Sequence, residues 1–185
     1  THQKYITFSD ANGKFSSHFI VLSNRLGDAA RDKVIIAGNQ RVLRARLADA
    51  EFFWQQDQAR ELESYLPALG DVTFYEGLGS IHDKAIRIEK LASAIAPHMP
   101  SADLKAASRA ARLAKADLVT GMVGEFPELQ GIMGGYYAAA SGEDKFVCDA
   151  ITAHYRPQGP ADELPATPEA MVVALADKID TLVGF

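Results

Sequence analysis

The chain has 185 residues, 48% of them hydrophobic and 23% charged, with a formal net charge of −5 at pH 7. This composition is typical of a folded globular protein and excludes an intrinsically disordered one, while the single cysteine excludes an internal disulfide and favours a reducing, cytoplasmic environment. The acidic balance argues against bulk electrostatic binding of nucleic acid, so DNA is not an expected partner, and no apolar run approaches the ~20 residues of a membrane span.

The N-terminal segment is predicted to form a β-hairpin. Residues 5–8 and 18–23 are rich in β-branched and aromatic side chains, and residues 9–13 between them have turn composition. A lone hairpin is marginal in water, so we interpret this one as the edge of a larger sheet. The chain also lacks an initial Met. We therefore expect a piece of a longer protein in which residues 1–37 end a preceding β-containing module.

From residue 38 onward the spacing of apolar residues is helical. Proline and glycine divide this region into about six helices, expected near residues 39–65, 81–98, 102–123, 127–141, 144–154 and 169–182. In the first of them, Phe53 and Trp54 lie where the apolar stripe is widest, and we expect at least Phe53 in the core. Ser80 and Ser101 are the expected N-caps of the second and third helices. The sequence predicts a mainly α chain, a helical bundle over residues 38–185 after a short β-hairpin, and excludes a doubly wound sheet.

Common catalytic motifs are absent from the sequence. It has no phosphate-binding glycine loop, no His-Glu-x-x-His pattern and no pair of cysteines, and Cys148 is interpreted as a buried structural thiol. Gly131, Gly134 and Gly135 lie in a helical pattern and would make a poor dinucleotide loop. We therefore expect no catalytic residue on motif grounds.

Residues 82–92, 114–119 and 175–180 resemble the ligand segments of the HD superfamily of metal-dependent phosphohydrolases, a helical-bundle family. In that family a His is followed by a His-Asp pair and then by a final Asp. The resemblance makes His82 the first His, Asp117 the Asp of the pair and Asp177 the last Asp, but the His of the pair falls on Ala116, which cannot bind a metal. It implies an HD-like bundle with a degenerate site and no metal. The alternatives are a surface or capping role for His82 and solvated or hydrogen-bonded aspartates.

A longer resemblance covers essentially the whole chain. Residues 1–5, 41–54, 115–120, 125–134 and 175–185 are similar, in order and spacing, to the β subunit of bacterial glycyl-tRNA synthetase. That family's β chain is much longer, so the resemblance implies a middle fragment that contains an HD-like helical domain and lacks the C-terminal anticodon-binding region.

The resemblance implies an α2β2 enzyme that joins glycine to its tRNA with ATP and Mg²⁺. Its catalytic core lies in the α subunit, so this fragment is expected to hold no cofactor and to support binding of the glycine tRNA and assembly with the α subunit. The alternative is an HD-type metal-dependent phosphohydrolase, which needs a histidine at position 116.

Basic residues on the third predicted helix are the preferred candidates for contact with tRNA. Lys105, Arg109 and Arg112 have i, i+4, i+7 spacing, which places them on one helical face, and no glutamate lies between residues 105 and 115. The arginine fork suits phosphate. A second candidate pair is Arg41 and Arg44, with Arg25 and Arg31 upstream. For both sets the alternative is a solvated or ion-paired surface.

Overall fold

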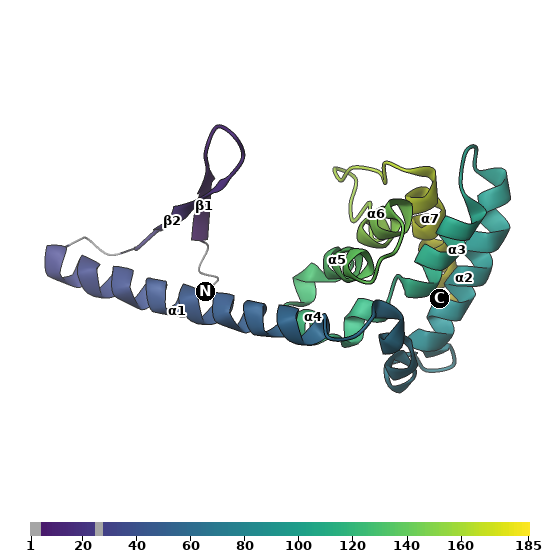
Figure 1. The fold of residues 1–185 in the computed structure, drawn as a ribbon, viewed down its shortest axis with the longest axis horizontal. Helices are drawn as coiled ribbons and strands as arrows, with labels where there is room; N and C mark the ends of the chain where they lie inside the picture. Colours follow the sequence, from purple (N-terminus) through teal and green to yellow (C-terminus); the bar gives the residue numbers. More distant parts are fainter. Residues whose placement is uncertain (1–4, 25–27) are drawn as a thin grey trace. The chain divides into compact units, whose positions relative to one another are not determined.

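The computed structural model describes residues 5–24 and 28–185. Residues 1–4, which carry part of the family resemblance, and Arg25 lie outside the described residues. The chain divides into two compact units, Thr1–Ala50 and Glu51–Phe185 (Figure 1). Within the part of the chain that the structure describes, no helix is both long enough and apolar enough to cross a membrane.

The first unit contains the predicted hairpin. Strands β1 (Tyr5–Ser9) and β2 (Phe15–Val21) pair antiparallel, with Tyr5 opposite Val21. Gly13 in the connecting turn has φ of 78°, a conformation that glycine adopts at little cost. The hydroxyl of Tyr5 donates to Oδ1 of Asn39 at 3.3 Å, which ties the hairpin to the helix that follows.

That helix, α1 (Ala29–Asp57), begins at Ala29 instead of near residue 39. The start signal that the periodicity missed is Asp28, whose carboxylate accepts a hydrogen bond from the backbone amide of Ala30. Because α1 runs without a break through residues 37 and 38, the predicted division of the chain at that point stays a prediction. The expected apolar stripe is not buried along most of α1, since the side chains of Val42 and Leu47 are 53% and 62% exposed.

The last turns of α1 pack within the second unit. Phe53 is half-buried, so its predicted place in the core is wrong; its ring lies so close to Gly121 that a Cβ there would come within 2.5 Å of it. The Trp54 ring stacks on that of Tyr137, with centroids 5.5 Å apart. The buried carboxylate of Asp57 accepts hydrogen bonds from the Gly121 amide at 2.9 Å and the Tyr137 hydroxyl at 2.8 Å. The hydrogen bonds of Asp57 and the stacking of Trp54 on Tyr137 therefore fix the last turns of α1 in place.

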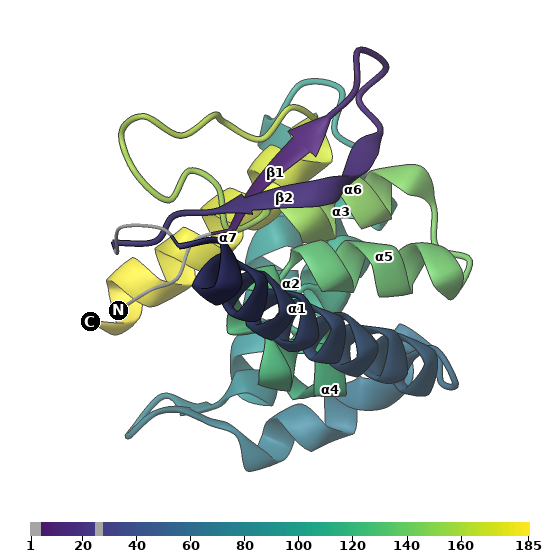
Figure 2. The ribbon, with the colours of Figure 1, turned by 90° about the vertical axis from the view of Figure 1, so that its left-hand side faces the viewer.

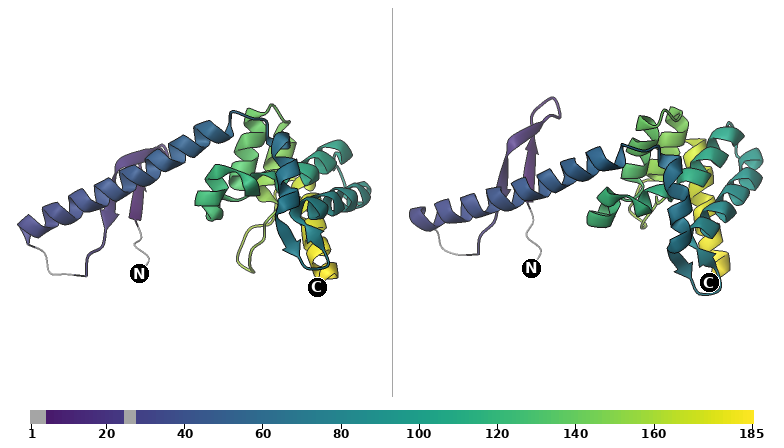
Figure 3. Two further views of the ribbon diagram at one scale, coloured as in Figure 1. Left: turned by 90° about the horizontal axis from the view of Figure 1, so that it is seen from below. Right: turned by 60° about the horizontal axis from the view of Figure 1, so that its bottom comes forward.

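The second unit is a bundle of helices and short 3₁₀ turns. Its elements are, in order, η1 (Leu62–Asp71), β3 (Thr73–Tyr75), β4 (Gly79–Ser80), α2 (Ile81–Ile95), η2 (Ala96–His98), α3 (Leu104–Leu113), η3 (Ala116–Val119), α4 (Gly121–Glu125), η4 (Pro127–Leu129), α5 (Ile132–Ala140), α6 (Lys145–Ala153) and α7 (Pro168–Gly184). Helices α2, α3 and α7 pack side by side, and α6 packs against α3, α5 and α7 (Figures 2 and 3). The prediction of a mainly α chain is confirmed, while the HD-like assignment stays a prediction.

Capping side chains set the helix boundaries. Ser80 and Asp83 form the expected capping box at the start of α2. The third predicted helix is capped by Asp103 and not by Ser101, which has a positive φ of 65°. That predicted helix also ends early, at Leu113; residues 116–119 form the turn η3, and the extended Thr120 then caps a new helix, α4.

The core lies between α2, α3, α6 and α7, and we expect its side chains to dominate the stability of the chain. Leu113 on α3 has no exposed surface. Replacing Leu113 with Ala should lower the free energy of unfolding by about 2–5 kcal/mol, through lost burial and the cavity left behind. Leu47→Ala on the exposed part of α1 is the matched control and should change it by less than about 0.5 kcal/mol. Urea unfolding of both variants checks this, and equal effects would contradict the core placement.

Candidate functional site

Charged side chains meet inside the second unit in what we call the buried lysine centre: Lys84, Lys115, His154, Asp177 and Asp180. Each is at most 8% exposed. They come from α2, from the residue that precedes η3, from the end of α6 and, for both aspartates, from α7. Because charges are rarely buried unless they are paired, the arrangement of partners decides what this centre can do.

The Lys115 ammonium lies between an imidazole and a carboxylate. Its Nζ is 2.8 Å from Nε2 of His154 and 2.9 Å from Oδ2 of Asp177, and it sits 3.9 Å from the centroid of the Tyr155 ring. The His154 Nδ1 lies 2.6 Å from the carbonyl oxygen of Ile151, so it donates there and leaves the Nε2 lone pair to accept from Lys115. The imidazole is thus held neutral and oriented by the backbone.

Lys84 binds the other side of the same carboxylate. Its Nζ is 3.1 Å from Oδ1 of Asp177, 3.0 Å from Oδ2 of Asp180 and 2.8 Å from the hydroxyl of Thr181. Nε of Arg87 donates to Oδ1 of Asp180 at 2.6 Å. Asp177 therefore bridges two ammonium groups, and α7 is tied to α2 and to the segment before η3.

The pKa values follow from this burial and charge. Burial, together with the neighbouring Lys115 ammonium, lowers the pKa of His154 to about 3. Burial alone would raise the pKa of Asp177, but Lys115, His154 and Lys84 outweigh it and bring the pKa to about 2. Burial also lowers the pKa of Lys115, against the opposing pull of Asp177.

Asp117 lies beside this centre but points toward α5. Its Oδ2 accepts hydrogen bonds from the amides of Gly131 and Gly134 at 2.6 and 3.0 Å, so it caps the N-terminus of α5. Gly131 has φ of 78°, and a Cβ on Gly134 would come within 3.0 Å of the same carboxylate. Burial raises the pKa of Asp117 to about 6, although both amides oppose that shift. The glycines of this segment therefore have a structural explanation.

The structure brings together only part of the degenerate HD pattern. Ala116 and Asp117 are fully buried and Asp177 is nearly so, whereas His82 is partly exposed in the first turn of α2. His82 precedes the inward-facing Lys84 by two residues, or about 200° around a helix, so it faces away from the centre.

The residues of the centre do not fit a metal ion. No group of three His, Cys, Asp or Glu side chains that could hold a metal occurs within residues 5–24 and 28–185. The Lys115 ammonium already occupies the position between His154 and Asp177. Sequence reasoning missed Lys84, Lys115, His154 and Asp180 as members of this centre, because no motif spacing marks them.

The predicted basic residues of α3 lie in a second cluster, which we call the ion-paired face: Arg109, Arg112, Glu63, Glu89 and Glu143. Glu143 grips the Arg109 guanidinium through both of its oxygens, with Nη2 to Oε1 at 2.6 Å and Nε to Oε2 at 3.2 Å. Glu63 bridges Arg109 and Arg112, and Glu89 lies 3.5 Å from Arg112. Three carboxylates therefore accompany the two arginines.

Lys105 lies at the end of the same face and is exposed. Its side chain makes no hydrogen bond or ion pair with any described residue. An open groove of about 470 Å³ runs beside it, lined by Glu89, Ser93, Leu104, Lys105, Ser108, Arg109 and Arg112. This is the one predicted basic set that the structure gathers around a groove within the described residues.

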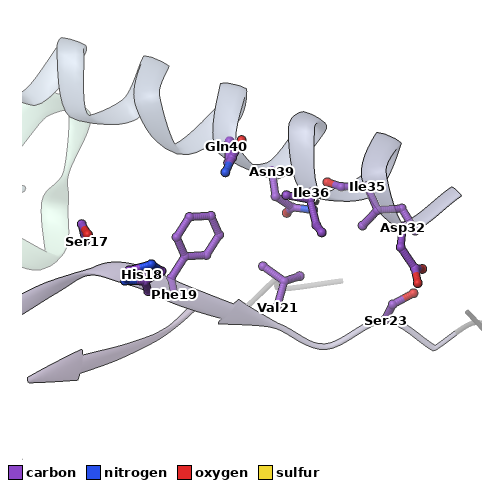
Figure 4. A pocket seen from close by; sticks show the side chains of 10 residues that line it. All are labelled: Ser17, His18, Phe19, Val21, Ser23, Asp32, Ile35, Ile36, Asn39 and Gln40. Carbon is purple, nitrogen blue, oxygen red and sulfur yellow. Dashed lines mark hydrogen bonds between the residues drawn. The ribbon is translucent and has the colours of Figure 1, made fainter. Parts of the chain in front are cut away.

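The second predicted pair, Arg41 and Arg44, lies on the exposed part of α1 in the first unit. Arg31 makes a 3.5 Å ion pair with Asp28, one turn away. The same unit has a groove of about 470 Å³ between β2 and α1, where Phe19 and Val21 point toward the helix (Figure 4). Its lining combines apolar and polar side chains with one imidazole, His18, and one carboxylate, Asp32.

Comparison with known proteins gives one consistent result. Residues 1–185 match the family model described as the glycyl-tRNA synthetase beta subunit. The chain is 55% identical over 185 residues to the glycine–tRNA ligase beta subunit of Aromatoleum aromaticum and 53% identical over 190 residues to that of Rhodospirillum centenum. It is 51% identical over 184 residues to that of Neisseria meningitidis. Each alignment covers 100% of this chain and 26% of the relative, so the chain spans about a quarter of the relatives' length.

The buried groups predict an unusual dependence of stability on pH. The pKa of His154 is lowered from its ordinary 6.5 to about 3. Its contribution to the free energy of unfolding is therefore present above pH 6.5 and is lost as the pH falls. The pKa of Asp117 rises from 3.8 to about 6, so its contribution is present below pH 3.8 and is lost as the pH rises. Between pH 4 and 6 the two effects should largely cancel in the wild type.

Asp117→Asn removes one of these opposing effects. Its free energy of unfolding should fall between pH 6 and pH 4 more steeply than that of the wild type, by up to about 1.4 kcal/mol per pH unit for one proton. His154→Gln should have the opposite effect, so that its free energy of unfolding rises, relative to the wild type, as the pH falls from 6 to 4. Urea unfolding from pH 4 to 7 measures both slopes, and profiles parallel to the wild type would contradict these titrations.

Proposed function

Because the chain belongs to the glycyl-tRNA synthetase β-subunit family, we propose that it is part of the β subunit of a glycine–tRNA ligase and helps to bind tRNA during ATP-dependent glycylation. The observation that carries this proposal is the match to the family along the whole chain. The chain covers 26% of the length of its relatives, so other parts of the subunit share this task.

In this proposal the chain supports binding and assembly and is not itself catalytic. The α subunit of an α2β2 enzyme supplies the active site, and ATP and Mg²⁺ are used there, in the cytoplasm. The buried lysine centre supports a structural role for this region, since its amine and imidazole groups are enclosed and committed to one another. A group that does chemistry on a substrate needs access to it.

We propose the groove beside α3 as the surface that contacts the tRNA backbone, with Lys105, Arg109 and Arg112 as its basic residues. Lys105 and the half-exposed Arg112 are the more accessible, while Glu143 holds Arg109 firmly in place. Arg41 and Arg44 form a second candidate contact on α1. Contacts of this kind bind phosphate without reading base sequence.

The alternative function, an HD-type metal-dependent phosphohydrolase, has less support. Ala116 supplies no ligand where that family has a histidine, and the Lys115 ammonium would repel a divalent cation from His154 and Asp177. The relatives are described as ligase subunits.

The tRNA contact predicts a specific kinetic change. In the assembled α2β2 enzyme, changing both Lys105 and Arg112 to Ala should raise the KM for tRNA, while ATP-dependent glycine activation should stay unchanged because it needs no tRNA contact. Each lost phosphate contact should flatten the slope of log affinity against log salt by about 0.7–0.9. Lys145→Ala, which removes an 82% exposed lysine on α6, is the matched control. A tRNA KM equal to that of the control at every salt concentration would assign this face to solvent or to a protein neighbour.

A second measurement tests the alternative. Purified chain incubated with nucleotides and added Mn²⁺, Mg²⁺ or Co²⁺ should release no phosphate above a buffer blank, because the donor set around Lys115 does not fit a metal. Phosphate release that Asp117→Ala abolishes would support the phosphohydrolase instead.

A further inference from the structure

Glu63 occupies an unusual position between the two arginines of the ion-paired face. Its Oε2 accepts from Nη2 of Arg109 at 2.9 Å, and its Oε1 accepts from Nε of Arg112 at 3.3 Å. The carboxylate thus presents one oxygen to each of two guanidinium groups that lie one turn apart on α3. A phosphate group binds paired arginines with the same pattern of acceptors.

The three carboxylates of this face are not equivalent. Glu143 is 16% exposed and makes three hydrogen bonds to Arg109, so it fixes that side chain in place. Glu63 is 43% exposed and makes a single hydrogen bond to each arginine. Exposed pairs of that kind are worth only about 0–1 kcal/mol, so water or another anion can replace Glu63 at little cost.

The charges on this face balance only while all three carboxylates are in place. The basic residues Lys105, Arg109 and Arg112 are balanced by the acidic residues Glu63, Glu89 and Glu143, so the face is neutral overall as it stands. Moving the Glu63 side chain aside leaves the Arg109 fork held by Glu143 and frees Nη2 of Arg109 and Nε of Arg112, two residues that line the groove. The hydroxyls of Ser93 and Ser108, which are 3.3 Å apart, also line that groove.

We propose that the Glu63 carboxylate occupies, in the free protein, the position on Arg109 and Arg112 that a backbone phosphate of tRNA takes on binding. This inference rests on the proposed function of the groove. In the free protein Glu63 pairs with both arginines and supplies one of the three negative charges that balance this face. When tRNA binds, a phosphate takes its position on Arg109 and Arg112, and the Glu63 side chain turns into solvent. Glu63 then weakens binding without being part of the final contact.

The test is the dissociation constant for glycine tRNA of the assembled α2β2 enzyme, measured by filter binding over a range of salt concentrations. Glu63→Gln keeps the shape of the side chain and removes the competing charge, so it should tighten binding about two- to fivefold at low salt, the equivalent of one exposed ion pair. The slope of log affinity against log salt should not change, because the same number of phosphates is bound. The gain should disappear when Arg112→Ala is also present.

Glu128→Gln is the matched control, since it removes one charge from an exposed glutamate on η4, outside the groove. A gain with Glu63→Gln no larger than with this control would overturn the proposal. A slope steeper by about 0.7–0.9 would also overturn it, because Glu63 would then exclude a phosphate instead of holding its place. If the Lys105 and Arg112 changes weaken binding while Glu63→Gln matches the control, only this inference fails. If those changes have no effect on binding, the proposed function of the groove fails as well.

Discussion

The ion pairs of the buried Asp177 carboxylate are the interaction on which the packing of the second unit depends. It lies on α7 and bridges Lys84 of α2 and Lys115 before η3, while Lys115 also binds the imidazole at the end of α6. One charged cluster thus joins four segments that are distant in sequence. Losing one partner would leave an uncompensated charge in a buried site, which typically costs several kcal/mol. Every side chain of the cluster is at most 8% exposed and is paired with another member.

This internal charge pairing bears on the function of the surface. Lys84 and Lys115 are used inside the bundle, so they cannot contact a polyanion, whereas Lys105, Arg109 and Arg112 lie at least partly exposed on α3. There the arginines are again paired with carboxylates, but the pairs are partly exposed and weak. The bundle is therefore held by strong buried pairs and presents weak exposed ones, which suits the reversible tRNA contact that we propose for this face.

The first unit differs from the second in how its apolar side chains are packed. Its hairpin and the exposed length of α1 bury few apolar side chains, and Phe15, Leu22 and Val34 are each more than 70% exposed. Apolar exposure of this extent is typical of surfaces that contact another protein segment. The stable anchor of α1 lies at its far end, where Asp57, Trp54 and Phe53 pack against the bundle.

The sequence alone determined the fold class, the hairpin, the position of most helices and the family, because these depend on local signals: periodicity, caps such as Ser80 with Asp83, and residues matched in order along the chain. It missed the local cap in which Asp103, and not Ser101, accepts from the Lys105 and Ala106 amides. It could not determine that Phe53 is half-buried, since the packing of that ring depends on neighbours distant in sequence such as Gly121. It predicted that Lys105, Arg109 and Arg112 share a face, but Glu63 and Glu143 come from other elements, and only the tertiary structure decided that they pair with Arg109. In the same way Ala116 indicated the loss of a metal ligand, whereas only packing decided that Lys115 lies between His154 and Asp177, because a buried ammonium must find its partners in three dimensions.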